Sequence, residues 1–327
     1  MVVVWFKQIQ VFRFSVPKAK TADDLKEALA KQKIGKCPTQ QTSTYGWSSP
    51  FGNGSAELLA SCGQYHCGRF TVSKRLLPLD VIRQTVEERA AQQESQQGIP
   101  VSKRDKRRML EEVHFELLPK AFVQQKSCDV IWDWKSGLMF VSNAQQALLD
   151  SLTASLAFCV PGWMIKCAKT QQSIEKKLTR CLKQEDTLPD GLNFGDACQL
   201  ADPKDRFCSI RFAGNELESQ SVKQHLEDGM WVKQAQLQWQ ERLKFVMNPQ
   251  FTFSQLKYLD IEKDLDDSED ANAKLLSELA LLGPIYTELA EFMGTCFGGF
   301  EEMKTASTAT EDSLISPFSE AEEMTSQ

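Results

Sequence analysis

The chain has 327 residues, with 38 Lys and Arg against 44 Asp and Glu, and a net charge of −6 at pH 7. This length can bury a sizeable core and indicates two or three structural units. The charge is uneven: residues 1–120 hold 19 Lys and Arg against 12 Asp and Glu, a net of +7, and the remainder holds 19 against 32, a net of −13. The overall isoelectric point near 5.4 would argue against a polyanionic partner, but such a partner meets a local patch and not the total.

Residues 1–75 are predicted to form an N-terminal α+β part. Val2–Phe14 is rich in Val, Ile and Phe and should be a strand, and Tyr65–Ser73 should be a second one. Between them, Thr21 and Asp24 are typical of a helix N-terminus, and the helix should end at Gly35. The turn-rich stretch Tyr45–Gly54 is predicted to be an ordered loop.

Residues 76–125 are predicted to form a helical arm. The pattern of Pro78–Gln97 favours a helix, and the polar segment that follows is broken by Gly98 and Pro100. A second helix should begin at Ser102, a good N-cap, and stop before Pro119. Two helices joined by a short break make an arm that could project from the body.

The second helix opens with an unusual run of charge. Its first six residues contain five cations, which are Lys103, Arg104, Lys106, Arg107 and Arg108. A helix N-terminus prefers acidic side chains, and each misplaced cation costs ~0.3–1 kcal/mol. An external polyanion would recover that stability. The alternative, a solvated basic face with no ligand, has about even weight on this segment alone.

Residues 126–299 are predicted to be a second α+β part. Ser127–Trp134 and Leu138–Ser142 should form a hairpin. Further strands are expected at Trp163–Ala168, Leu192–Leu200, Phe207–Ala213, Met230–Gln240 and Arg242–Met247, and helices at Gln145–Leu156, Ser173–Leu182, Ser219–Asp228 and Asp267–Leu282. The last helix should be interrupted at Gly283–Pro284 and continue to Phe292. Intermixed strands and helices with hairpins indicate an α+β fold with largely antiparallel sheets and peripheral helices. The Thr-, Ser- and Glu-rich residues 300–327 are expected to be disordered.

Little in the sequence points to catalysis. The three histidines, His66, His114 and His225, lie in no catalytic motif, and no nucleotide-binding or hydrolase motif occurs. The ten cysteines are expected to be reduced in the cytoplasm, because the N-terminus does not resemble a signal peptide. Cys62, His66 and Cys67 are the only candidate metal nucleus, and no second ligand pair follows. We therefore expect a non-enzyme without cofactor or metal. No segment approaches the ~18 apolar residues that a membrane span needs.

Cations spread along a surface are the candidate site instead. Besides the five cations of the basic helix, they are Lys120, Lys74, Arg75 and Lys7. No zinc finger, helix-turn-helix or aromatic RNA-binding motif accompanies them. That pattern favours contacts with phosphates, which position a protein on a duplex without reading its sequence.

With these residues in view, the chain resembles the recombination-associated protein RdgC family. The resemblance spans residues 1 to about 298. The segments that carry it are Trp5–Lys7, Gly46–Trp47 with Pro50 and Gly52, Leu76–Pro78 with Val81–Ile82, Leu117–Phe122, Trp132–Met139 and Leu237–Met247.

The resemblance implies a cytoplasmic, nucleoid-associated protein that binds double-stranded DNA and is not an enzyme. It implies a homodimer closed into a ring around the duplex, which limits access of the RecA recombinase to DNA. It also implies a dimer contact at Phe122, with Leu118 beside it, and a second contact through sheet edges.

Two features depart from the family pattern. After Ile210–Arg211, where relatives can carry lysines, this chain has Ala213–Leu217, so Arg211 is the one cation expected to contact DNA there. The tail from 300 to 327 lies beyond the resemblance; its acids could repel or mimic DNA, although an inert tail is favoured. Two alternatives stay open: an acidic protein–protein adaptor with incidental DNA binding, and a metal-dependent nuclease.

Overall fold

The computed structural model describes residues 5–17, 21–52, 55–205, 207–214, 217, 219–259 and 270–303. In these residues twelve strands join into one sheet, whose main path runs β2-β4-β5-β6-β1-β12-β11-β10-β8-β9. All of the strand pairs are antiparallel. The predicted α+β class and the antiparallel pairing are therefore confirmed.

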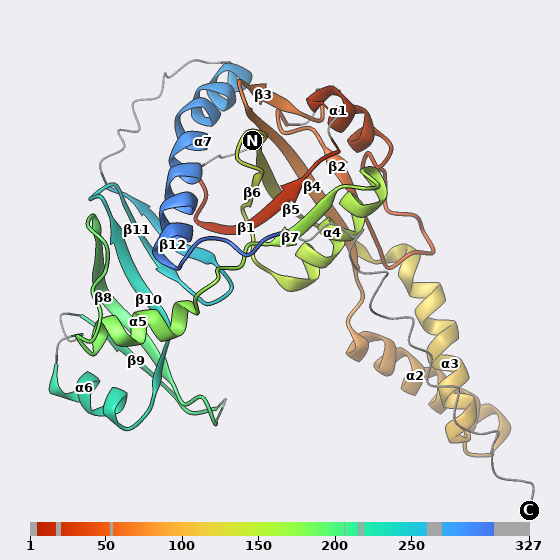
Figure 1. Ribbon diagram of the computed structural model, residues 1–327. Coiled ribbons are helices and arrows are strands. Elements are labelled where there is room, and N and C mark those ends of the chain that lie inside the picture. The colour runs from red at the N-terminus through yellow and green to blue at the C-terminus, as the bar shows by residue number, and fades with distance from the viewer. Residues whose placement is uncertain are drawn as a thin grey trace, which may run out of the picture.

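The upper body in Figure 1 is built on the first seven strands. They are β1 (Gln8–Ser15), β2 (Ser43–Ser48), β3 (Ala60–Cys62), β4 (Tyr65–Leu76), β5 (Phe122–Asp133), β6 (Leu138–Val141) and β7 (Met164–Cys167). One face packs on α1 (Ala22–Ala30) and α4 (Gln146–Cys159), and the other face packs on α7 (Ala271–Cys296). Successive side chains of β5 pack on opposite faces of the sheet: Trp132 points to the α4 side and Ile131 to the α7 side.

The same sheet continues into a lower lobe. There it contains β8 (Leu192–Ala201), β9 (Ser209–Ala213), β10 (Trp231–Trp239), β11 (Leu243–Met247) and β12 (Thr252–Tyr258), with α5 (Ile174–Leu182) and α6 (Gln220–Glu227) beside them. The first strand, β1, lies between β6 and β12 and pairs with both. The sheet thus runs through both α+β parts that the sequence predicts.

Three expectations about single elements differ from the structure. The start of the predicted loop, residues 45–48, belongs to β2, where Trp47 is fully buried and its Nε1 donates a hydrogen bond to Ser155 Oγ at 3.0 Å. The strands β3 and β12 were not predicted. The first strand begins at Gln8, and residues 2–4 of its predicted range lie outside the described residues.

The predicted interruption at Gly283–Pro284 is absent, and α7 is one helix of 26 residues. Its buried side runs without a break through both residues, from Leu279 and Leu282 to Tyr286 and Leu289. A side chain at Gly283 would stand 2.7 Å from the ring of Tyr65, so this glycine lets the helix lie directly on β4. Packing on the sheet therefore outweighs the local signal of a helix breaker.

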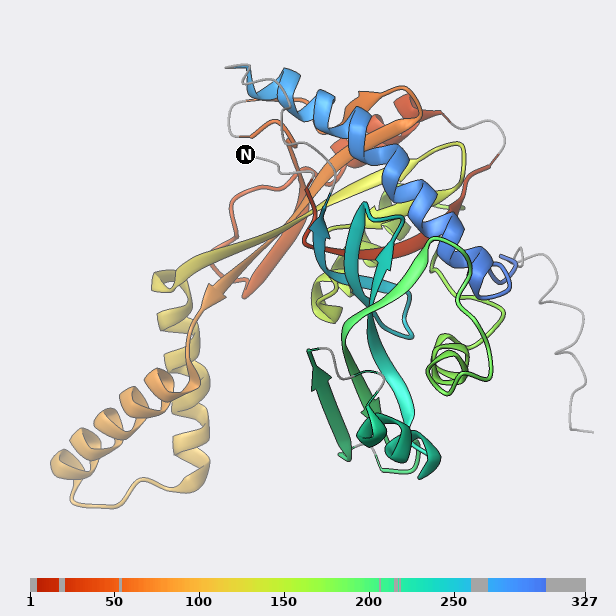
Figure 2. The same ribbon diagram turned by 90° about the vertical axis from the view of Figure 1, so that its left-hand side faces the viewer.

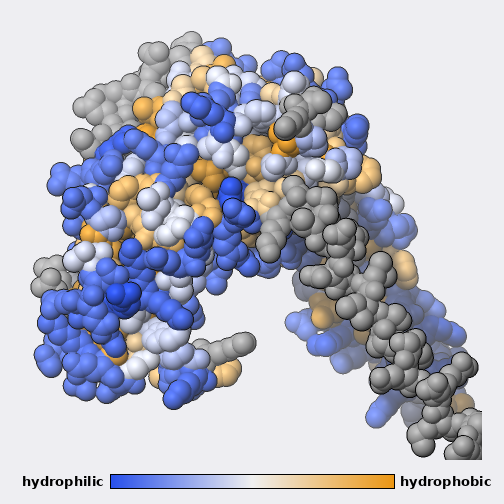
Figure 3. Space-filling model, viewed as in Figure 1, coloured by the Kyte–Doolittle hydropathy of each residue, from blue (hydrophilic) through white to orange (hydrophobic). Residues whose placement is uncertain are grey.

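The arm leaves the body through a two-stranded ribbon made by the ends of β4 and β5. It consists of α2 (Leu79–Gln97), α3 (Lys103–Leu117) and the short 3-10 helix η1 (Leu118–Lys120). Gly98 ends α2 in the left-handed conformation, with φ of 66°, which suits a residue without a side chain. Figure 2 shows the two helices side by side, well away from the sheet. An open space separates the arm from the lower lobe in Figure 3.

Candidate nucleic-acid interface

The basic turns of α3 are fully exposed on the arm. Ser102 caps the helix as predicted, because its Oγ accepts a hydrogen bond from the backbone N–H of Asp105 at 3.2 Å. All five cations are exposed. Among the described residues, Arg108 pairs with Glu112 at 3.3 Å, and the other four cations make no ion pair. The helix start thus carries concentrated positive charge that the surrounding chain leaves uncompensated.

A small apolar seam holds α2 and α3 together. Ile82, Val86 and Val113 are its buried members, with Met109 and Leu117 among the partly buried residues packed on them. An ion pair of 2.6 Å between Arg89 and Glu116 joins the two helices on the outside. The hydrogen bond from Arg89, with its charge, lowers the pKa of the Glu116 carboxyl. The arm is therefore a defined unit, although its core is slight.

Arg75 lies in the base of the arm and not on its surface. Its side chain is buried, and the guanidinium donates to the backbone carbonyls of five residues, which are Cys37, Pro38, Leu118, Pro119 and Ala121. A guanidinium held in this way fastens η1 and the loop after α1 to the end of β4. Because it is buried and engaged, we assign Arg75 a structural role and do not retain it among the proposed DNA contacts.

The remaining predicted cations are exposed but come from different elements. Lys74 precedes Arg75 on β4 and points to the other side of the ribbon. Lys120 ends η1 and lies 3.6 Å from Glu116. Arg211 is on β9 in the lower lobe, across the open space from the arm, and Lys7 precedes β1 in the body. The structure therefore groups the α3 cations and Lys120 on one arm and sets Arg211 apart from them.

The two residues of the predicted dimer contact also differ in exposure. Phe122 is 84 % exposed, whereas Leu118 is 2 % exposed and is buried inside its own chain. Leu118 therefore cannot offer its side chain to a second copy, and it is left out of the proposed contact. Leu76, which sequence reasoning missed, lies opposite Phe122 in the β4–β5 register and is 46 % exposed. Exposed apolar side chains of Leu79 and Val81 continue this surface onto α2.

The two ends of the sheet differ in how open they are. β2 ends one side, and an isolated parallel bridge between Lys33 and Trp47 covers part of its outer edge. β9 ends the other side, and in the described residues it pairs with β8 alone. An open strand edge of this kind presents unpaired N–H and C=O groups.

The comparisons with known proteins cover almost the whole chain. A family model described as "Putative exonuclease, RdgC" matches residues 4–300. The chain belongs to the RdgC family. Similar relatives are the recombination-associated protein RdgC of Burkholderia cenocepacia, 28% identical over 89% of this chain and 96% of the relative, and that of Pseudomonas aeruginosa, 26% identical over 91% and 98%. The RdgC of Paraburkholderia phymatum is 29% identical over 82% and 88%.

The word exonuclease in the RdgC model directs attention to metal-binding side chains. In the part of the chain that the structure describes, no group of three or more His, Cys, Asp or Glu lies close enough to hold a metal ion. His66 is buried in β4, and its Nδ1 lies 2.9 Å from Ser61 Oγ. Burial raises the pKa of the neighbouring Cys67 thiol well above its usual value. His114 and His225 lie on α3 and α6, apart from His66.

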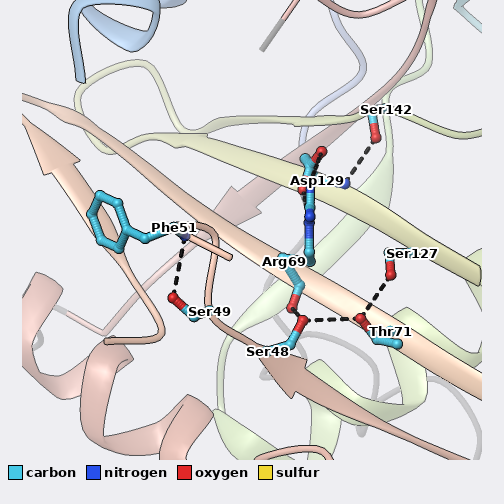
Figure 4. A network of polar contacts seen from close by, with 8 residues as sticks. All are labelled: Ser48, Ser49, Phe51, Arg69, Thr71, Ser127, Asp129 and Ser142. Atoms are coloured by element: carbon cyan, nitrogen blue, oxygen red, sulfur yellow. Dashed lines mark hydrogen bonds and ion pairs between the residues drawn. The ribbon is translucent and has the colours of Figure 1, made fainter. Parts of the chain in front are cut away.

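A polar network ties the strands together where the ribbon leaves the body (Figure 4). Thr71 Oγ1 lies 2.9 Å from Ser48 Oγ and 2.8 Å from Ser127 Oγ, which links β2, β4 and β5. Arg69 and Asp129 form an ion pair beside it. Because it joins three neighbouring strands that lead to the arm, we interpret this network as support for the arm. No helix of the described residues is long and apolar enough to cross a membrane.

Proposed function

We propose that this RdgC protein binds double-stranded DNA without sequence preference, through the basic turns of α3. The observation that carries the proposal is a set of exposed cations at the start of α3 that make no ion pair with any residue the structure describes. They are Lys103, Arg104, Lys106 and Arg107. Arg108, Lys120, Lys74 and Arg211 would add contacts. Side chains of this type meet phosphate oxygens, which are the same in every sequence.

The energetics of the helix favour a polyanion at this position. The like charges repel one another, and they oppose the partial positive charge of the helix N-terminus, at ~0.3–1 kcal/mol per misplaced cation. A phosphate backbone laid along the arm would remove both penalties. Each phosphate neutralised also contributes ~0.9 to the salt slope, so affinity should fall steeply as salt rises.

The protein would act as a homodimer that closes a ring around the duplex. The apolar surface of Leu76, Leu79 and Phe122 at the base of the arm supplies one contact, because exposed aromatic side chains often anchor interfaces. The open edge of β9 supplies a second one by strand pairing. Two such contacts would enclose the space between the arm and the lower lobe.

In the cell, the ring would be a nucleoid protein and not an enzyme. Its relatives carry the name recombination-associated protein. A ring that occupies duplex DNA would limit the access of the RecA recombinase, and it needs no chemical step to do so.

The test replaces three cations on the arm. The Arg104, Arg107 and Arg108→Ala variant should lose at least tenfold in affinity for several unrelated duplexes alike, because three phosphate contacts at about 0.5–1 kcal/mol each are removed. The matched control removes Lys26 and Lys31, on and after α1, and Lys135, in the turn between β5 and β6 at the end of β5 away from the arm; all three are exposed, and the variant should bind as the wild type. Equal losses in both variants, or a loss on one sequence only, would refute the assignment.

Two other functions make different predictions. The net charge of −13 after residue 120 would suit an acidic adaptor. In that case the triple variant should still bind the protein partner, and DNA binding should be negligible at physiological salt.

An exonuclease, the activity in the family description, would shorten linear DNA when magnesium is added. If linear DNA stayed intact after incubation with the full chain and magnesium, exonuclease activity would be excluded.

A further inference from the structure

The C-terminal segment has a net negative charge and lies beyond the family match. Residues 304–327 contain one Lys and five carboxylates, a net of −4 out of −6 for the whole chain. The carboxylates are Glu311, Asp312, Glu320, Glu322 and Glu323. The RdgC model ends at residue 300, so whatever this segment does is added to what the matched residues do.

The segment also has an apolar centre. Directly after Glu311 and Asp312 come Ser313, Leu314, Ile315, Ser316, Pro317 and Phe318. Acidic residues on both sides of a short apolar run suit a surface on which cations stand next to exposed apolar side chains.

The arm presents such a surface. Arg104, Arg108 and Phe115 share one side of α3, because their spacings of four and seven residues correspond to one and two helical turns. Phe115 is 61 % exposed, and Ile99, in the turn before α3, is 68 % exposed. Arg107 and Lys103 lie along one flank of this side, whereas Lys106 lies on the opposite face of the helix, and none of the three makes an ion pair in the described residues.

The segment is long enough to reach the arm of its own chain. Met303, the last described residue, lies on the body, where it lines a shallow pocket with Arg13, Ser15 and Met164. Twenty-four residues span up to ~80 Å when extended, compared with a radius of gyration of ~20 Å for a compact chain of this length. Tethering also gives the segment an effective concentration of about a millimolar at sites it can reach.

We propose that residues 304–327 dock on the α3 surface of their own chain and compete with DNA for it. The carboxylates take the place of phosphates on Lys103, Arg104 and Arg107, and the apolar centre covers Phe115. The competition rests on the proposed DNA binding, whereas the docking itself does not. The segment thereby sets a minimum duplex length for binding: long duplexes with many phosphates displace it, and short ones do not.

Docking is tested without DNA, on the full chain. A zero-length carbodiimide joins carboxylates to amines that are in contact, so the acids of the segment should become linked to Lys103, the amine on the flank of the docking side. The yield should not change on dilution, and a mixture of isotopically heavy and light copies should give links within copies only. Links between copies would instead mean docking in trans, and links elsewhere or none would also overturn the proposal.

Competition is tested with two variants of the segment. Changing Glu311, Glu320, Glu322 and Glu323 to Gln and Asp312 to Asn should tighten duplex binding about 3- to 10-fold near 50 mM salt, with no gain at high salt. The matched control, Leu314, Ile315 and Phe318→Ser, keeps every charge and should still tighten binding several-fold. If this control bound the duplex only as tightly as the wild type, the gain of the first variant would come from net charge alone, and docking would be refuted. If crosslinks form but no variant binds DNA, the proposed function fails and the docking stands.

Discussion

Arg69 and Asp129 face each other across β4 and β5 and are joined by two hydrogen bonds. Arg69 Nε lies 2.7 Å from Asp129 Oδ1, and one terminal nitrogen lies 3.0 Å from Oδ2. Burial raises the pKa of the Asp129 carboxyl, and the hydrogen bonds and charge of Arg69 offset part of that rise. The pair (Figure 4) stands where β6 ends, on the part of β4 and β5 that continues beside β2 toward the arm.

Removing one partner of this pair should destabilise the chain strongly. Asp129→Asn leaves the guanidinium of Arg69 without its counter-charge at 18 % exposure, and we expect a loss of about 3 kcal/mol in the free energy of unfolding. Urea denaturation followed by circular dichroism measures it. The double variant Arg69→Met with Asp129→Leu should recover most of the loss, because neither side chain is then charged. A double variant as unstable as the single one would contradict this account.

Arg75 and Lys74 are adjacent but should behave in opposite ways. Arg75→Ala removes the partner of five backbone carbonyls, so it should lower the unfolding free energy by about 3 kcal/mol and expose the base of the arm to protease. Lys74→Ala should leave both readouts unchanged and weaken DNA binding by a small factor. Limited proteolysis and thermal melting, run side by side, separate the two. Equal protease sensitivity in both variants would argue against the clamp.

Removing a single carboxylate on α3 should strengthen DNA binding. Glu112 holds Arg108 at 3.3 Å, and both side chains are mostly exposed. Glu112→Gln frees this cation and deletes a negative charge, so affinity should rise about 2- to 5-fold, in line with ~0.5–1 kcal/mol for an exposed pair. Fluorescence anisotropy with a labelled duplex measures it. Glu87→Gln on α2, an exposed carboxylate with no ion pair among the described residues, is the control and should have a smaller effect.

Phe122→Ala should weaken the dimer without disturbing the fold. The ring is almost entirely exposed in the single chain, so its removal leaves no cavity. A central aromatic anchor contributes about 2 kcal/mol or more to an interface, which corresponds to a roughly 30-fold weaker dimer. Sedimentation velocity over a concentration series detects it. Phe158→Ala on α4, exposed to 65 %, should leave the association unchanged; a matching shift there would point to a general effect of lost apolar surface.

His66 should make the chain less stable in mild acid. Burial lowers the pKa of its imidazole below the ordinary value of 6.5, although the carboxylate of Asp23 offsets part of the effect. The native state therefore favours the neutral ring, and its contribution to stability is complete above pH 6.5 and is lost as the pH falls through the lowered pKa. Melting temperatures between about pH 7 and 5 should fall less steeply for His66→Asn than for the wild type. Parallel curves would exclude this residue as a source of acid sensitivity.

Features that depend on neighbouring residues in the sequence could be predicted, whereas features that depend on contacts between distant residues could not. Ser102, Pro119 and the cations between them define α3 within a few residues, and the structure has the helix there. Arg75 looked like a surface cation because the carbonyls that surround it come from residues 37 and 38 and from η1. Leu118 and Phe122 look equivalent in the sequence, and only the turn at η1 buries one and exposes the other.

The position of β1 also has a consequence for synthesis of the chain. Its partners are β6, which ends at Val141, β7, which ends at Cys167, and β12, which ends at Tyr258. The first three residues of β1, Gln8–Gln10, therefore wait on one side for residues made some 240 positions later. Pairing over such a separation is slow, because a long loop must close before any contact is gained. A nascent chain emerging from the ribosome would keep an unpaired strand edge until nearly the whole sheet had been translated, which makes it a natural client for chaperones that shield such edges.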